Sequence, residues 1–306
     1  MAKEKQTGGK KHITGARIAK EIRQYKKDVF LSPMYTTFCV ILEILIPYLT
    51  ASIIDKGIAV GDMGHVARIG ALMAVMAVMA MFCGMRAGIH SARASTGLAS
   101  NLRESMFARI QDYSFSNIDK FSTAGLVTRL TTDVTNIQNA FQMLLMICTR
   151  SPVTLIVALF MAFSISARLS LIFLVAMAFL AVMLVIFIPK AMGYFKQMFK
   201  KYDKVNGVVK ENVGAIRVVK AFVREDYEDK KFSDAAGELF QNSISAERII
   251  SFNMPIMQLT VYSCILLISW FGAKMIVNQT GLTTGELTSL LSYVMNILMS
   301  LMMLSM

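Results

Sequence analysis

Ionisable residues inside apolar segments are the first candidates for chemistry in this chain. Glu43 lies near the middle of one apolar stretch, and Arg150 lies in the first half of another. A charge at such a depth in a bilayer is costly, and it commonly marks a ligand path or an ion pair between helices. Two hypotheses follow: Glu43 faces a central cavity and favours cationic amphiphiles, or Glu43 and Arg150 form a structural pair. Gln258 and Asn296 are further candidates for a substrate cavity.

Aromatic and charged residues in two polar segments form a second set of candidates. The segments are 111–120 and 221–228, and each connects two long amphipathic patterns. Aromatic side chains with a polar rim are typical anchors for another protein. The alternative is that Phe222 packs inside its own hairpin and that the charges are only solvated. The candidate contact residues are Tyr113, Phe115, Asn117 and Asp119 in the first segment, and Phe222, Arg224, Glu225, Asp226 and Tyr227 in the second.

The composition places these residues in a membrane protein. Of the 306 residues, 55% are hydrophobic and 17% are charged, whereas about 25% are charged in a typical soluble domain. The apolar blocks are about 20 residues long, as a helix needs to cross a bilayer. We therefore expect an all-α membrane fold with six transmembrane helices and two long helical extensions on one side. The expected spans are 30–54, 66–88, 143–164, 169–188, 254–277 and 286–306.

The distribution of charge predicts the orientation of these spans. The formal net charge is +12, and most Lys and Arg residues lie in the N-terminal region and in the two extensions. The positive-inside rule makes those parts cytoplasmic. Residues 1–15 are then a basic cytoplasmic tail, 16–28 an interfacial elbow helix, and 29–306 the membrane domain. Because the positive charge reflects topology, we expect contact with the lipid bilayer and no nucleic-acid partner.

Two motifs in the extensions resemble a known family. Residues 121–138, FSTAGLVTRLTTDVTNIQ, resemble the F-D-x-x-x-x-G-x-L-x-x-R-L-T-x-D-V-x-x-I-Q stretch of ABC exporters, except that Ser122 replaces the usual Asp. Residues 211–232, ENVGAIRVVKAFVREDYEDKKF, resemble the E-N-x-x-G-I-R-V-V-K-A-F-x-R-E-x-x-E-x-x-x-F stretch. The chain thus resembles an ABC exporter transmembrane domain, and it is most similar to halves of heterodimeric bacterial multidrug exporters.

The resemblance implies partners and a mechanism. The segments 111–120 and 221–228 correspond to coupling helices, which dock on nucleotide-binding domains that are covalently attached or separate. A second, different half-transporter and a bacterial inner membrane are also implied. ATP-driven closure of those domains would move the tips and open a cavity outward to export drugs, lipids or peptides. A membrane scaffold or receptor, or an ion-coupled secondary transporter, is the alternative.

The site for ATP is expected to lie outside this sequence. A phosphate-binding loop requires G-x-x-x-x-G-K-[ST], which does not occur, and the glycine-containing run at 281–289 lacks a lysine. The four cysteines are dispersed and predict neither a metal site nor a disulfide. We therefore expect no cofactor or metal in this chain and no ATPase activity from it alone. ATP and Mg²⁺ would be bound by a nucleotide-binding domain on a longer chain or a separate subunit.

Overall fold

The computed structural model describes residues 18–113 and 123–305, and this described part is almost entirely helical and contains no strand. Six of its helical segments are long and apolar enough to cross a membrane. This confirms the predicted all-α fold with six transmembrane helices. The long helices are α2 (Lys26–Ser52), α3 (Met63–Gln111), α6 (Val134–Ile165), α7 (Ala167–Gly214), α9 (Glu225–Val277) and α10 (Thr284–Ser305).

Short elements connect or extend these helices. They are η1 (Arg23–Tyr25), the π-helix η2 (Ile53–Ile58), α5 (Thr123–Thr128), the π-helix η3 (Arg129–Asp133) and α8 (Ile216–Ala221). The chain divides into two compact units, which are Met1–Ala167 with Phe271–Met306, and Arg168–Trp270.

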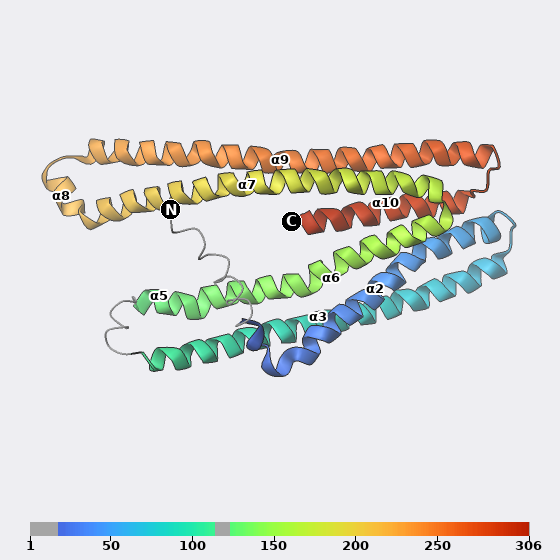
Figure 1. The fold of residues 1–306 in the computed structure, drawn as a ribbon, viewed down its shortest axis with the longest axis horizontal. Coiled ribbons are helices and arrows are strands. Elements are labelled where there is room, and N and C mark those ends of the chain that lie inside the picture. The colour runs from blue at the N-terminus through green and yellow to red at the C-terminus, as the bar shows by residue number, and fades with distance from the viewer. Residues whose placement is uncertain (1–17, 114–122, 306) are drawn as a thin grey trace, which may run out of the picture. The chain divides into compact units, whose positions relative to one another are not determined.

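The first unit is organised around α2, which packs against α3, α6 and α10 (Figure 1). Val40 and Ile44 of α2, Leu98 of α3, Ala158 of α6 and Tyr293 of α10 are each at most 2% exposed. Most other apolar side chains of α3 are exposed, including its methionines at positions 79, 81 and 85. A buried seam flanked by exposed apolar surface is the pattern expected of helices that pack together within lipid.

A polar seam fixes one end of α10 against α2. Asp55 of η2 accepts hydrogen bonds from the Gly285 backbone amide at 2.9 Å and from Thr283 Oγ1 at 2.5 Å. One turn further along, Ser289 Oγ donates to the Pro47 carbonyl at 2.5 Å, and Tyr293 Oη then donates to the Ile44 carbonyl at 3.1 Å. Gly285, Ser289 and Tyr293 recur every four residues, so one face of α10 bonds both to Asp55 of η2 and, through Ser289 and Tyr293, to two carbonyls of the proline-containing part of α2.

The expected elbow helix over 16–28 is interrupted in its described part. A turn at Glu21 and Ile22 leads into η1, where Arg23 has φ +40°, and α2 begins at Lys26. A positive φ is unusual for a non-glycine residue. The interruption places the Tyr25 ring against Gly97 of α3, at a position where a Cβ atom would overlap that ring.

Polar contacts hold this segment on α3. Arg23 bonds to Glu104 Oε2 at 3.0 Å and to Ser105 Oγ at 2.8 Å. Asn101 Nδ2 donates to the Glu21 carbonyl at 2.6 Å, and Ser105 Oγ donates to the Glu21 carboxylate at 3.0 Å. The N-terminal segment is therefore bound to α3 by specific side chains.

The second unit is a long antiparallel hairpin of α7 and α9, with α8 at one end (Figure 1). Helix α7 has 48 residues and continues through Pro189. Its apolar residues recur at helical spacing beyond the expected span, as predicted for an amphipathic extension. At about 1.5 Å per residue, such helices are long enough to span a bilayer and to extend well beyond it.

Candidate functional site

The chain reverses direction at the α8–α9 tip, which we define as residues 216–228. Helix α8 ends at Ala221, Val223 has φ +50°, and α9 begins at Glu225. The reversal is closed by the Arg224 amide, which donates to the Val219 carbonyl at 3.0 Å. A β-branched residue with positive φ is an outlier, so the tip holds a strained, specific turn. The predicted segment 221–228 thus comprises this turn and the first turn of α9, while the short helix lies just before it.

Large apolar side chains are exposed at this tip. Phe222 is 74% exposed, Val223 is 80% exposed and Tyr227 is 60% exposed. Phe222 therefore does not pack within its own hairpin, which was the alternative considered from the sequence. Exposed aromatic side chains clustered at a protruding turn suit a protein contact.

Charged residues frame these side chains. Lys220 Nζ donates to Glu225 Oε1 at 2.9 Å and thereby ties the end of α8 to the start of α9. This hydrogen bond lowers the pKa of Glu225. Arg224 and Asp226 are exposed. The predicted residues of this segment thus form one surface, with apolar anchors beside a mixed-charge rim.

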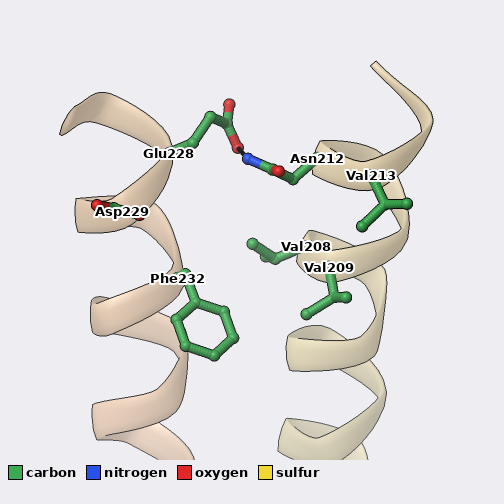
Figure 2. A pocket seen from close by; sticks show the side chains of 7 residues that line it. All are labelled: Val208, Val209, Asn212, Val213, Glu228, Asp229 and Phe232. Atoms are coloured by element: carbon green, nitrogen blue, oxygen red, sulfur yellow. Dashed lines mark hydrogen bonds between the residues drawn. The ribbon is translucent and has the colours of Figure 1, made fainter. Parts of the chain in front are cut away.

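A small groove lies beside the tip, between the last turns of α7 and the first turns of α9 (Figure 2). Its volume is about 140 Å³. Asn212 Nδ2 donates to Glu228 Oε2 at 3.4 Å across one end, and the Phe232 ring lies in the gap between the two helices (Figure 2). The lining residues are Val208, Val209, Asn212, Val213, Glu228, Asp229 and Phe232. The amphipathic spacing of the sequence predicts that these faces of α7 and α9 meet, but it does not predict the groove between them.

Ion pairs join α7 to α9, the two helices of the hairpin, at positions further from the turn than the α8–α9 tip. Lys201 and Lys204 of α7 both bond to Glu238 of α9, at 2.6 and 3.1 Å. These bonds, led by the one from Lys201, lower the pKa of Glu238. Lys231 bonds to Glu211 at 2.8 Å, and this raises the pKa of Lys231. Pairs this exposed contribute little stability individually, but several along one seam fix the register of α7 against α9.

The first predicted contact segment lies mostly outside the described residues. Tyr113 is half-buried at the end of α3, whereas Phe115, Asn117 and Asp119 fall in the undescribed range 114–122. The helices on either side are braced by Arg103 of α3, whose guanidinium bonds to the Leu130 carbonyl of η3. In both helical extensions, the α3–α6 side and the α7–α9 hairpin, polar contacts thus join the two antiparallel helices.

The structure brings together the two predicted intramembrane charges. Arg150 Nη2 donates to Glu43 Oε2 at 2.5 Å, and Cys39 Sγ donates to Glu43 Oε1 at 3.3 Å. The side chains are 45% exposed for Arg150 and 41% for Glu43. The pair therefore joins α6 to α2 and remains accessible from one side, which is compatible with either hypothesis derived from the sequence.

The other two cavity candidates belong to different compact units of the chain. Asn296 is half-buried on α10, in the same compact unit as Glu43 and Arg150. Gln258 is exposed on α9, in the other unit, and its Nε2 donates to Tyr262 Oη at 3.4 Å. Within the described residues, no group of three or more His, Cys, Asp or Glu side chains is arranged to hold a metal ion.

Comparison with known proteins agrees with this architecture. The family model for the ABC transporter transmembrane region matches residues 29–302. An uncharacterized ABC transporter ATP-binding protein of Bacillus subtilis, YfiB, is 31% identical over 82% of this chain and 44% of its own length. An uncharacterized ABC transporter ATP-binding protein of Mycobacterium bovis is 30% identical over 95% of this chain and 50% of its own length. An ATP-dependent lipid A-core flippase of Hahella chejuensis is 25% identical over 67% of this chain and 34% of its own length.

The chain spans about half the length of the first two of these relatives. The matched region includes four of the six candidate spans completely, most of the first and the last, and both motif-bearing extensions. The resemblance of the two motifs to the transmembrane domain of ABC transporters is thereby confirmed. This multi-pass membrane protein belongs to the ABC transporter transmembrane-region family and corresponds to the transmembrane half of its longer relatives.

Proposed function

We propose that this chain is the membrane-spanning half of an ATP-driven exporter of hydrophobic or amphipathic compounds. The observation that carries the proposal is the α8–α9 tip, where exposed Phe222, Val223 and Tyr227 stand at the end of a braced helical hairpin. A tip of this kind can transmit movement only when another domain binds to it. The relatives named as ATP-binding proteins support a nucleotide-binding domain in that role.

In this mechanism the chain converts movement of its tip into movement of its membrane helices. ATP and Mg²⁺ bind the nucleotide-binding domains, which are attached or separate. Closure of those domains displaces residues 216–228, and the long helices α7 and α9 carry the displacement toward the bilayer. Substrate and ATP must bind the inward-open and outward-open states unequally for transport to be coupled.

We propose the remaining parts of the assembly on the same basis. Both helical extensions and the N-terminal region lie on the cytoplasmic side of a bacterial inner membrane, because they carry most of the positive charge. A second half-transporter, a different chain, completes the translocation path. Glu43, Arg150, Gln258 and Asn296 contribute to that path, which takes drugs, lipids or peptides.

Transport by inverted membrane vesicles tests the proposal. The vesicles contain this chain with its nucleotide-binding domains and the second half-transporter, and they are offered acidic, neutral and cationic fluorescent amphiphiles. We expect uptake of at least one amphiphile that requires ATP hydrolysis and persists after ionophores dissipate the ion gradients. Uptake that follows an ion gradient without ATP would indicate a secondary transporter. Tip-dependent binding of a protein other than an ATPase, without any uptake, would indicate a scaffold.

A further inference from the structure

Polar and sulfur-containing residues, together with one isoleucine, form a continuous stripe along one face of α6. The stripe consists of Asn139, Gln142, Met143, Met146, Ile147 and Arg150, which recur at intervals of three, one, three, one and three residues. At about 100° per residue they occupy an arc of about 140° on the helix, with Arg150 near its middle. We call these six residues the α6 stripe.

The polar members of the α6 stripe indicate that this face does not meet lipid. A guanidinium in a membrane span faces protein or a water-filled space, because exposure to hydrocarbon is costly. The structure has an open hollow of about 430 Å³ here, lined by Asn139, Gln142, Met143, Met146 and Ile147. Arg150 follows one turn beyond the hollow on the same face. The remaining walls must come from other parts of the transporter.

The unused hydrogen-bonding capacity at Arg150 indicates the charge of the ligand. Both oxygens of Glu43 are already engaged, by Cys39 and by Arg150. A guanidinium has five N–H donors, and within the described part of the chain Arg150 uses one of them on a side chain. With 45% of its side chain exposed, Arg150 retains four N–H donors, whereas the Glu43 carboxylate, with about four lone-pair sites, retains about two. The pair therefore suits an acceptor better than a cation.

The rest of the α6 stripe suits the apolar part of the same ligand. Met143 and Met146 are 54% and 39% exposed, and methionine adapts to apolar groups of varied shape. Asn139 and Gln142, at the end of the stripe away from Arg150, carry carboxamides that both donate and accept hydrogen bonds.

We propose that the α6 stripe binds an amphiphile with an acidic head group, a phosphate or a carboxylate. The head group accepts hydrogen bonds from Arg150, and the apolar part lies against Met143 and Met146. This site rests on the proposed transport function and gives its substrate a charge, opposite to the cationic preference expected from Glu43 alone. Glu43 neutralises Arg150 between ligands and weakens, rather than provides, ligand binding.

Protection of a thiol from maleimide tests this site in the assembled transporter. Cys83 and Cys264 are changed to Ala, the buried Cys39 is kept because it bonds to Glu43, and the reporter carries Met146→Cys with Cys148→Ser. The matched control keeps Met146 and the native Cys148, which is exposed on the opposite face of the same helix. The transporter is held in phosphatidylcholine nanodiscs, and labelling at each position is read by peptide mass spectrometry. The probes share one chain length: dodecyl phosphate, dodecanoate, dodecanol and dodecyltrimethylammonium.

We expect the two acidic probes to slow maleimide labelling at position 146 by about tenfold, which is the effect expected from one hydrogen bond to a charged group. Labelling of Cys148 in the control should not change. A difference between dodecyl phosphate and dodecanoate then separates a phospholipid-like head group from a fatty-acid-like one. Arg150→Gln should abolish the protection, and Arg150→Lys should retain part of it. Glu43→Gln should lower the concentration of acid required, because it frees a further donor of Arg150.

Three results would overturn the proposal. They are protection by the ammonium probe equal to or greater than that by the acids, protection that survives Arg150→Gln, and absence of protection by every probe. The double variant Glu43→Gln with Arg150→Gln keeps the site neutral and controls for an unpaired charge. ATP-dependent uptake is measured on the same preparation. If uptake persists while position 146 is unprotected, the exporter function stands and only this site is rejected.

Discussion

Arg103 of α3 donates through Nε to the Leu130 carbonyl at 3.1 Å and through Nη2 to Thr135 Oγ1 at 3.0 Å. Leu130 lies in the π-helix η3, between α5 and α6. π-Helical turns are rare, occur frequently at functional sites and disturb the regular hydrogen-bond ladder of an α-helix. Arg103 thus binds the irregular turn η3 and the start of α6, and it holds this side of the first helical extension against α3.

We predict that Arg103→Leu loosens the first extension. The change removes two hydrogen bonds, and we expect a loss of about 1–3 kcal/mol in the free energy of unfolding. Thermal unfolding of the purified transporter and hydrogen exchange of the η3 amides measure the effect. Arg109→Leu is the control, because Arg109 is exposed one to two turns further along α3. Equal effects of the two changes would show that the Arg103 contacts do not brace the extension.

Gly285 is predicted to be intolerant of even a methyl group. A Cβ atom at this position would lie 2.5 Å from the Ala51 carbonyl oxygen and 2.6 Å from the Asp55 carboxylate. Gly285→Ala should therefore separate α10 from α2 and destabilise the fold by about 1–3 kcal/mol. Gly88→Ala is a matched control in α3, where nothing lies within 4 Å of the added atom. The prediction fails if the midpoint of thermal unfolding falls by the same amount for both variants.

Gly97 and Tyr25 are predicted to be energetically coupled. Gly97→Ala introduces an atom that overlaps the Tyr25 ring, so it should displace the segment of Glu21 and Arg23 from α3. Tyr25→Ala should remove most of the additional cost of Gly97→Ala, since the overlap no longer exists. A double-mutant cycle on the free energy of unfolding measures this coupling. Additive effects of the two changes would contradict the observed packing.

The pairing of Glu238 predicts a pH dependence in the second unit. Hydrogen bonds from Lys201 and Lys204 lower the pKa of Glu238 from its ordinary value of 4.5. Because the folded-state pKa is the lower one, the stabilisation is complete above pH 4.5 and is lost as the pH falls through the folded-state pKa. Protection factors for hydrogen exchange in α7 and α9, corrected for the pH dependence of the intrinsic exchange rate, should therefore fall on acidification toward and below that value.

Glu238→Gln should remove this component of the pH dependence. The matched control is Glu247→Gln, an exposed glutamate on the same helix. A pH profile that Glu238→Gln leaves unchanged, or that Glu247→Gln alters equally, would assign the effect to other carboxylates.

Local patterns were sufficient to predict the elements that depend on one helix at a time. Hydropathy located the six spans, and helical spacing predicted that α7 continues beyond the membrane. The depths of Glu43 and Arg150 in their spans were sufficient to suggest the ion pair, because two charges at similar depth have few other partners.

Features that depend on contacts between distant residues were not predictable. The local sequence does not distinguish Gly285 from an ordinary loop glycine, because the contact that requires a glycine is with Asp55, 230 residues earlier. The groove beside the tip depends on how far α8 separates α7 from α9, which hydrophobic periodicity does not specify. The break at Arg23 follows from the fit of Tyr25 against Gly97, whereas the local sequence pattern favours a continuous helix.

Coupled transport by a variant at Phe222 tests the central claim most directly. Phe222→Ser removes the exposed aromatic side chain at the α8–α9 tip, and Phe240→Ser is its matched control on the same hairpin, since Phe240 is 60% exposed but lies away from the tip. ATP hydrolysis and ATP-dependent amphiphile uptake are measured together in proteoliposomes of the complete transporter. The account predicts that Phe222→Ser lowers uptake per ATP hydrolysed by about tenfold or more, as for loss of an interface hot spot, while Phe240→Ser leaves it unchanged. Unchanged uptake per ATP in Phe222→Ser would contradict the claim that this tip couples the membrane domain to its ATPase.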